Sequence, residues 1–384
     1  MRRKKATELD EIAAAYLLAN ENRSQATIAE LLGVSAPVVS RLIARARKKD
    51  YLIKEFRFVE ERLKPEMMQA VRQRLSRSRF AGRLDELSRA TCGRPGPTVR
   101  VFPSSSETHD SDVTLGAFAV HAAPHIHDLL LRSELCGVTW GRMLLNLVVA
   151  LRHVRVPSAP RRREVIPLAG EPLGKEPTTS SSSTLANELG RIMNEDKYQA
   201  KSLTMVPALV PKDFNSAERR AVYKLVERLP DYGEIFGRVG TRQKTKQKTN
   251  TLAHRVDCIL TSLGREPLGF SDGSLLNASE QQLFVGDIGG VLIPRAQLGK
   301  ADRQLEKDIE ARWTGLRQEH VEACADRARA AANTSNSPPG VVIVSVGEKR
   351  APVVLEAIRG GLANHLVIDS ELEYALSKLI PESS

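Results

Sequence analysis

Seven short runs of mostly apolar, β-branched residues recur through the last three quarters of the chain, separated by segments with helical periodicity. Strands that are apolar along their whole length are buried on both faces, and the intervening helices supply the crossovers of a parallel sheet. The sequence therefore predicts an α/β fold with a Rossmann-like parallel sheet. The runs are residues 99–102, 135–138, 165–169, 203–210, 256–263, 341–346 and 365–368. Residues 171–184, which are rich in Pro, Ser and Thr, and the basic run at 238–248 interrupt the pattern and are expected to be loops; the basic run is either solvated or contacts phosphate or DNA.

The composition is that of a globular protein with more than one domain. A chain of 384 residues corresponds to two or three domains at about 150 residues each. Hydrophobic residues make up 41% and charged residues 27%, which is enough apolar material for a sizeable core. Because aromatic residues contribute only 4%, that core must be mainly aliphatic.

The first 50 residues show three helical patterns with a tight turn between the last two. Residues 8–20 place apolar side chains along one stripe of a helix. Ser24 is a suitable N-cap for a short second helix, and Gly33 is suited to the left-handed conformation that ends it. Ser35 then starts a third helix, in whose first turn Pro37 is tolerated. This layout predicts a helix-turn-helix.

The third of these helices separates an apolar face from a polar and cationic one. Short side chains lie near its N-terminus and cations lie further along, an arrangement that lets the first turn approach base edges while Arg and Lys reach phosphates. We therefore predict that this face binds DNA; the alternative is a solvated basic face on an ordinary helical hairpin. The predicted DNA-binding residues are Ser35, Pro37, Ser40, Arg41, Ala44, Arg45 and Lys48.

The charge balance agrees with a polyanionic partner. Lys and Arg exceed Asp and Glu by 57 − 46 = 11, which favours nucleic acid or a phosphorylated ligand, although a membrane surface would fit the charge equally well. The apolar runs are too short for a membrane-spanning helix. The basic start at Met1 is followed by Glu8, Asp10 and Glu11, which interrupt any signal-peptide core. We expect a cytoplasmic protein with no membrane partner.

The region between the helix-turn-helix and the sheet is predicted to be a helical linker. Residues 51–58 alternate as in a strand or wing, and residues 60–79 carry Leu63, Met67 and Val71 at heptad-like spacing. This helix would either form an oligomerisation stalk or pack on its own body. The predicted domains are a DNA-binding domain at 1–58, a linker at 59–96 and an effector domain at 97–384.

Glycine-bearing strand ends are candidate anion sites in the larger domain. In an open parallel sheet, ligands bind at the carboxyl ends of strands, where helix N-termini meet. Three such ends occur at 136–142, 261–265 and 345–349, although glycine also ends strands for steric reasons alone. Thr139 and Arg142 in the first, and Lys349 in the third, would hold a phosphate. Asp287 would accept hydrogen bonds from hydroxyl groups.

The sequence supports a catalytic or metal-binding function less strongly than it supports DNA binding and anion binding. Asp287, Glu348 and Lys349 could transfer protons on a sugar phosphate, so an isomerase or deaminase with a basic appendage is the alternative function. His121, His125 and His127 lack further ligands, and Pro124 interrupts their helical spacing. Four widely spaced cysteines form no Cys-x-x-Cys motif. We expect buried thiols, no catalysis, no metal and no cofactor.

Taken together, the motifs resemble the SorC family of sugar-binding transcriptional regulators, often labelled DeoR-like. The resemblance spans nearly the whole chain in the family's order. The motifs are Ile28-Ala-Glu-Leu-Leu-Gly-Val-Ser35, Val39-Ser-Arg-Leu-Ile43, Gly137-Val-Thr-Trp-Gly141, Val256-Asp-Cys-Ile-Leu-Thr-Ser-Leu-Gly264, Gly286-Asp287, Gly347-Glu-Lys349 and Ala357-Ile-Arg-Gly-Gly-Leu-Ala-Asn-His-Leu-Val-Ile-Asp369.

The resemblance implies a non-catalytic regulator in which a phosphorylated sugar bound to an isomerase-like or deaminase-like domain controls operator binding. It also implies a homodimer or homotetramer on operator DNA. Arg142-Met143 departs from the family, which usually carries a hydroxyl residue just after the Trp-Gly pair. The effector-binding residues are then Gly137, Thr139, Trp140, Gly141, Gly264, Asp287 and Lys349, with Arg142 beside them.

Overall fold

A computed structural model of the chain provides the structure. It describes thirteen stretches separated by gaps, two of which are single residues. They are residues 7–21, 23–52, 67, 79–104, 111–154, 163–171, 180–194, 198–237, 251–264, 276, 278–295, 299–332 and 337–380. The predicted wing beyond residue 52, most of the predicted stalk at 60–79 and the basic run at 238–248 lie outside these residues.

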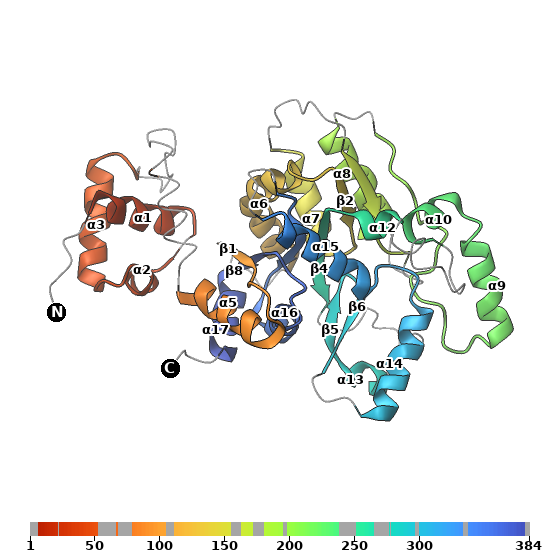
Figure 1. The fold of residues 1–384 in the computed structure, drawn as a ribbon. Coiled ribbons are helices and arrows are strands. Elements are labelled where there is room, and N and C mark those ends of the chain that lie inside the picture. Colours follow the sequence, from red (N-terminus) through yellow and green to blue (C-terminus); the bar gives the residue numbers. More distant parts are fainter. Residues whose placement is uncertain are drawn as a thin grey trace.

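The N-terminal region is a cluster of three helices, α1 (Glu8–Ala19), α2 (Gln25–Leu32) and α3 (Ala36–Lys48) (Figure 1). Ser24 accepts a hydrogen bond from the Thr27 amide and so caps α2. Gly33 has φ +64°, a left-handed conformation that an L side chain rarely adopts. The helix-turn-helix predicted from the cap and the glycine is therefore present.

The larger region is built on a sheet of six parallel strands in the order β1-β8-β7-β4-β2-β3. This order confirms the α/β class and the parallel sheet. A hairpin of β5 and β6 continues from β4 in antiparallel pairing. The strands are β1 (Thr98–Phe102), β2 (Leu135–Val138), β3 (Glu164–Pro167), β4 (Cys258–Gly264), β5 (Phe284–Ile288), β6 (Val291–Pro294), β7 (Gly340–Ser345) and β8 (His365–Asp369).

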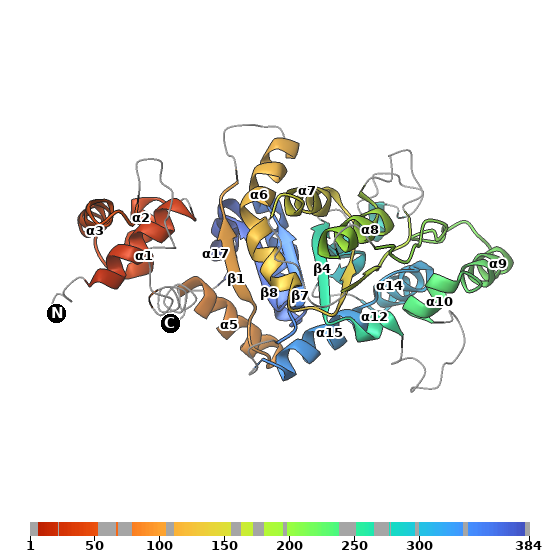
Figure 2. The ribbon, with the colours of Figure 1, turned by 90° about the horizontal axis from the view of Figure 1, so that it is seen from above.

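Helices cover both faces of the sheet (Figure 2). The remaining helices of the described chain are α5 (Arg79–Cys92), α6 (Ser111–Leu130), α7 (Arg142–Leu151), α8 (Ser182–Met193), α9 (Ser216–Val226), α10 (Pro230–Phe236), α12 (Leu252–Arg255), α13 (Ala278–Gln282), α14 (Lys300–Arg312), α15 (Gln318–Ala330), the 3₁₀ turn η4 (Glu348–Arg350), α16 (Ala351–Arg359) and α17 (Ser370–Leu379).

The two faces of the sheet belong to two separate cores because side chains alternate along each strand. On β7, Val342 and Val344 pack with α6, α7 and α8 in one core. Val341 and Ile343 point the other way, into a core shared with α5, α15, α16 and α17. Burial on both faces explains why these strands are apolar throughout, as the sequence pattern indicated.

The run at 203–210 was expected to be a strand and is not one. Most of its apolar side chains are buried, although Met205 is 72% exposed. The backbone of the run makes only isolated bridges, from Pro207 to Glu171 and from Leu209 to Trp313. A turn at 204–206 and Pro207, which has no amide hydrogen, prevent a continuous ladder. The apolar run thus reflected burial, not strand pairing.

Two further expectations need correction. Residues 171–184 were expected to be a loop, but Ser181 caps α8 and the helix starts at Ser182. Pro124 was expected to interrupt the helical spacing of the nearby histidines, but it lies inside α6, which runs from Ser111 to Leu130. A serine cap starts a helix within the run that is rich in Pro, Ser and Thr, and α6 continues through a proline that disfavours helix.

The described cysteines are free thiols, as expected. Cys136, Cys258 and Cys324 are buried and Cys92 is half-buried. No single helix among the described residues is long and apolar enough to cross a membrane. The pair α2 and α3 is together long and apolar enough, but the two helices are bent by 99° relative to each other.

His365, the first residue of β8, gives the folded state a predictable response to acid. Burial, reinforced by Arg132 and Arg100, lowers the pKa of His365 to about 4. Between pH 6.5 and 4 the unfolded chain therefore binds a proton that the folded chain does not, so stability falls as pH falls through this window. We expect a loss of about 2 kcal/mol from this group, because its partial exposure reduces the full effect of the shift.

Urea denaturation at pH 7 and pH 4.5 measures this contribution. Acid weakens other interactions too, so the comparison is between the wild type and His365→Gln, which cannot titrate. The variant should lose less stability on acidification. Equal losses in the two proteins would show that His365 is not the acid-sensitive group.

Candidate functional site

The face of α3 predicted to bind DNA is open to solvent. All seven predicted residues are exposed, whereas the apolar side of the same helix is buried against α1 and α2. Pro37 occupies the first turn, where it removes no intrahelical hydrogen bond. The exposed residues are Ser35, Pro37, Ser40, Arg41, Ala44, Arg45 and Lys48, and the buried ones are Val39, Leu42, Ile43 and Ala46.

The cations of α3 are not equivalent. The Lys49 ammonium lies 2.9 Å from carboxylate oxygens of both Glu8 and Glu11, and the Arg45 guanidinium lies 3.5 Å from Glu11. These contacts tie α3 to α1, and the Lys49 hydrogen bond is the main reason that the pKa of Glu8 is lowered. Neither Arg41 nor Lys48 forms an ion pair with another described residue. The charges of these two are therefore the ones available for phosphates.

The candidate ligand site in the sheet centres on β2 and β4. From β2 the chain proceeds outward to β3, and from β4 it proceeds to β7 on the other side. This reversal is the topological switch point at which open α/β sheets bind ligands. The Thr139 hydroxyl, directly after β2, donates a 3.0 Å hydrogen bond to the Thr261 hydroxyl of β4. The sequence prediction thus placed Thr139 at the correct edge of the sheet.

The turn between β5 and β6 covers this threonine pair. Both hydroxyl residues are fully buried, and a Cβ added to Gly289 would lie 2.4 Å from Thr139 Cγ2 and 2.6 Å from Thr261 Oγ1. A Cβ added to Gly290 would lie 2.0 Å from the Trp313 ring. Only glycines allow the turn to approach so closely. For a ligand to touch Thr139 directly, the turn must move.

Asp287 shapes this turn and is not an open acceptor. Its side chain is 2% exposed, and Oδ1 accepts a 2.8 Å hydrogen bond from the Gly290 amide. The Asp287 backbone pairs with Gly264 at the end of β4. Asp287 therefore pairs with Gly264 at the end of β4 and holds the turn whose Gly289 meets the threonine pair.

Aromatic rings border the same region. The Trp140 ring meets the Trp313 ring edge to face, with centroids 5.5 Å apart, and the Ser262 hydroxyl donates to the Trp140 carbonyl. Gly141 has φ +121° and precedes α7. Trp313 and Thr261 were not among the predicted residues; Thr261 lay within a quoted motif, but Trp313 had no signal in the local sequence.

The other predicted ligand residues lie apart from the threonine pair. Gly137 is inside β2, where a Cβ would lie 2.3 Å from Leu168, so its smallness serves packing. Arg142 is 68% exposed and its guanidinium lies 3.6 Å from Asp112. Lys349 is exposed on η4, after the end of β7. Lys349 therefore follows the carboxyl end of β7, and β4 separates that strand from β2 and Thr139.

A buried carboxylate at the end of β3 escaped the sequence prediction. Glu171 is 8% exposed, and burial raises its pKa despite the opposing effect of the Ser181 and Ser183 hydroxyls. Its backbone pairs with Val206 and Ala208. A single glutamate among the Pro, Ser and Thr residues that follow β3 carries no signal of burial in the sequence.

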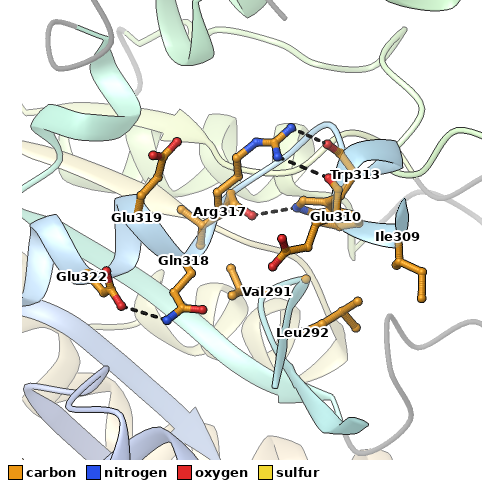
Figure 3. A pocket seen from close by; sticks show the side chains of 11 residues that line it. Val291, Leu292, Ile309, Glu310, Trp313, Arg317, Gln318, Glu319 and Glu322 are labelled. Atoms are coloured by element: carbon orange, nitrogen blue, oxygen red, sulfur yellow. Dashed lines mark hydrogen bonds between the residues drawn. The ribbon is translucent and has the colours of Figure 1, made fainter. Parts of the chain in front are cut away.

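Trp313 also lines a cavity of about 440 Å³ (Figure 3). Apolar side chains of β6 and α14 form one part of its wall, and polar side chains at the start of α15 form another. The lining residues include Val291, Leu292, Ile309, Glu310, Trp313, Arg317, Gln318, Glu319 and Glu322.

The structure matches solved transcriptional regulators of the SorC and DeoR families over most of the chain. No family model matches the sequence, and no curated protein matches it. A transcriptional regulator from Streptococcus pneumoniae TIGR4 aligns with a TM-score of 0.51 and 16% identity, over 78% of this chain and 97% of the other. That similarity shows a shared fold.

Two more of these regulators align with lower TM-scores. The full-length sorbitol operon regulator SorC from Klebsiella pneumoniae gives 0.48 at 19% identity, over 95% of this chain and 97% of the other. A DeoR family transcriptional regulator from Listeria monocytogenes gives 0.47 at 16% identity, over 76% and 98%.

Proposed function

We propose that the chain is a transcriptional regulator of the SorC type, which binds operator DNA through α3 and whose DNA binding is controlled by a phosphorylated sugar or related metabolite. One observation carries the first part: every predicted DNA-contacting side chain is exposed on one face of α3, while the opposite face packs on α1 and α2. Arg41 and Lys48 supply charge for phosphates, and the short side chains of Ser40 and Ala44 let the helix approach bases.

The parallel sheet supports the second part of this proposal. The Thr139 and Thr261 hydroxyls meet at the switch point beneath the turn between β5 and β6, which has to move before a ligand reaches them. Lys349 stands exposed at the same edge of the sheet. Hydroxyl groups and a cation are the groups that recognise a phosphorylated polyol. The Streptococcus pneumoniae protein whose fold this chain shares is a transcriptional regulator, which agrees with the proposal. We expect a cytoplasmic homodimer or homotetramer without catalytic activity.

The experiment has two arms. DNA fragments are first selected by the full-length chain from a random duplex library, which yields the operator sequence, and a symmetric or repeated motif is expected from a dimer. A panel of sugar and polyol phosphates is then screened for a rise in melting temperature, since a ligand of the folded state stabilises by mass action. Selection of no sequence would refute the DNA-binding part, and a phosphosugar turned over by the chain would establish the enzyme alternative.

Replacing Lys349 is the sharpest test of the ligand site. Lys349→Ala should weaken binding of the effector found in the panel by about 10- to 100-fold, because a charge-assisted contact with phosphate is lost. Affinity of the ligand-free protein for the operator should stay unchanged, since Lys349 is exposed on η4 and not on α3. Calorimetric titration of the effector gives the first quantity and fluorescence anisotropy of labelled operator the second. A variant with normal effector affinity would remove Lys349 from the site.

A further inference from the structure

We propose that His254, Glu319 and His320 form a binding site for a divalent transition metal ion, with Zn²⁺ as the ion to test first. One ligand atom from each side chain lies within 4.8 Å of the other two. His254 comes from α12, and the other two come from the first turn of α15. Two imidazole nitrogens and one carboxylate oxygen are a donor set typical of Zn²⁺ sites that retain an open coordination position.

The side chains need only a small adjustment to bind an ion. Ligand atoms about 2.1 Å from a tetrahedral Zn²⁺ lie about 3.4 Å from one another. The three atoms therefore have to approach one another by about 1 Å, which rotation of the side chains supplies. The rings of His254 and His320 are already adjacent, with centroids 4.4 Å apart and planes at 82°.

The hydrogen bonds of the two Nδ1 atoms indicate which nitrogen of each imidazole would bind the ion. Nδ1 of His254 lies 3.1 Å from the Thr251 hydroxyl, a contact that orients the ring and leaves Nε2 as the ligand atom. Nδ1 of His320 accepts a 3.0 Å hydrogen bond from the Arg317 amide. Binding through His320 Nε2 transfers the proton to Nδ1 and breaks that bond. Because binding costs one capping bond, we expect an affinity of about micromolar rather than that of a closed structural site.

The surroundings supply both signs of charge. Glu319 also lines the 440 Å³ cavity together with Glu310 and Glu322, and their negative charge favours a cation. Arg317 opposes them, although its guanidinium is held by the carbonyls of Glu310 and Trp313. Arg327 adds a second positive charge through its hydrogen bond to the His254 carbonyl. The three carboxylates outnumber these two cations.

The test uses the full-length chain without a polyhistidine tag and titrates it with Co²⁺, whose visible absorption reports nitrogen ligation, and then with Zn²⁺ as competitor. We expect one ion per chain. His254→Gln and Glu319→Gln each remove a ligand, and His320→Gln removes the imidazole while its amide oxygen can still accept from the Arg317 amide. Each variant should bind at least tenfold more weakly. His121→Gln, at an exposed histidine of α6, is the matched control and should bind as the wild type does.

Circular dichroism and thermal melts establish that each variant is folded before its titration is interpreted. The proposal is overturned if the wild type takes up no stoichiometric Co²⁺ or Zn²⁺ at about 0.1 mM, or if the folded His254→Gln and Glu319→Gln variants bind as tightly as the control.

Discussion

Replacing Arg41 and Lys48 together by alanine is expected to lower affinity for operator DNA by one to two orders of magnitude. Both side chains are exposed on α3 and neither is paired with a described carboxylate, so both are available for phosphates. Each lost phosphate contact should also reduce the slope of log K against log salt by about 0.9 for every bound protomer. Fluorescence anisotropy at several salt concentrations measures both effects.

Two further variants separate a DNA contact from a general loss of charge. Arg220→Ala removes an equally exposed arginine from α9 and should change neither affinity nor salt slope. Arg45→Ala should lower operator affinity less than the double variant but more than Arg220→Ala, because Glu11 already neutralises part of the Arg45 charge. If the double variant and Arg220→Ala lose the same affinity, α3 is not the DNA-binding helix.

Most of the fold could be predicted because its signals are local. Gly33 and Ser24 mark the turn and the cap of the helix-turn-helix by their own conformational preferences. Six of the seven predicted strands are present because burial on both faces requires unbroken apolar runs. The remaining run, 203–210, is mostly buried as irregular backbone: Ala208 and Leu209 pack with Trp313 and α14, whereas Leu203 and Val206 join the core on one face of the sheet. Burial alone does not distinguish these cases.

The candidate ligand site was harder to predict because its arrangement depends on contacts distant in sequence. Thr139 follows β2 and Gly264 ends β4, a position that could be predicted because the carboxyl ends of parallel strands meet at one edge of the sheet; their role in binding a ligand stays a prediction. The turn that covers the threonine pair was not predicted. It joins β5 and β6 in an antiparallel hairpin, and the pattern of strands alternating with helices indicates only parallel strands. The same applies to Trp313, which lies 173 residues beyond Trp140 in the sequence and meets it only in the folded chain.

Gly290→Ala is expected to destabilise the fold by about 3 kcal/mol. Gly290 has φ +95°, which an L side chain adopts only with strain, and its added Cβ would lie 2.0 Å from the buried Trp313 ring. Strain and overpacking each contribute about 1 to 3 kcal/mol. Urea denaturation measures the loss. Gly82→Ala is the matched control, because Gly82 lies in α5 with open space around it and should gain up to about 1 kcal/mol from helix propensity.

A double-mutant cycle with Trp313→Leu separates the two causes. Trp313→Leu alone destabilises by removing a buried ring, but in its presence the Cβ at position 290 no longer meets an indole. The double variant should therefore lose about 1 to 2 kcal/mol less stability than the two single variants lose together, and the backbone strain at position 290 remains. Additive losses would mean that the indole does not restrict the turn. In that case the closure over Thr139 would depend on Gly289 and its contact with the threonine pair instead.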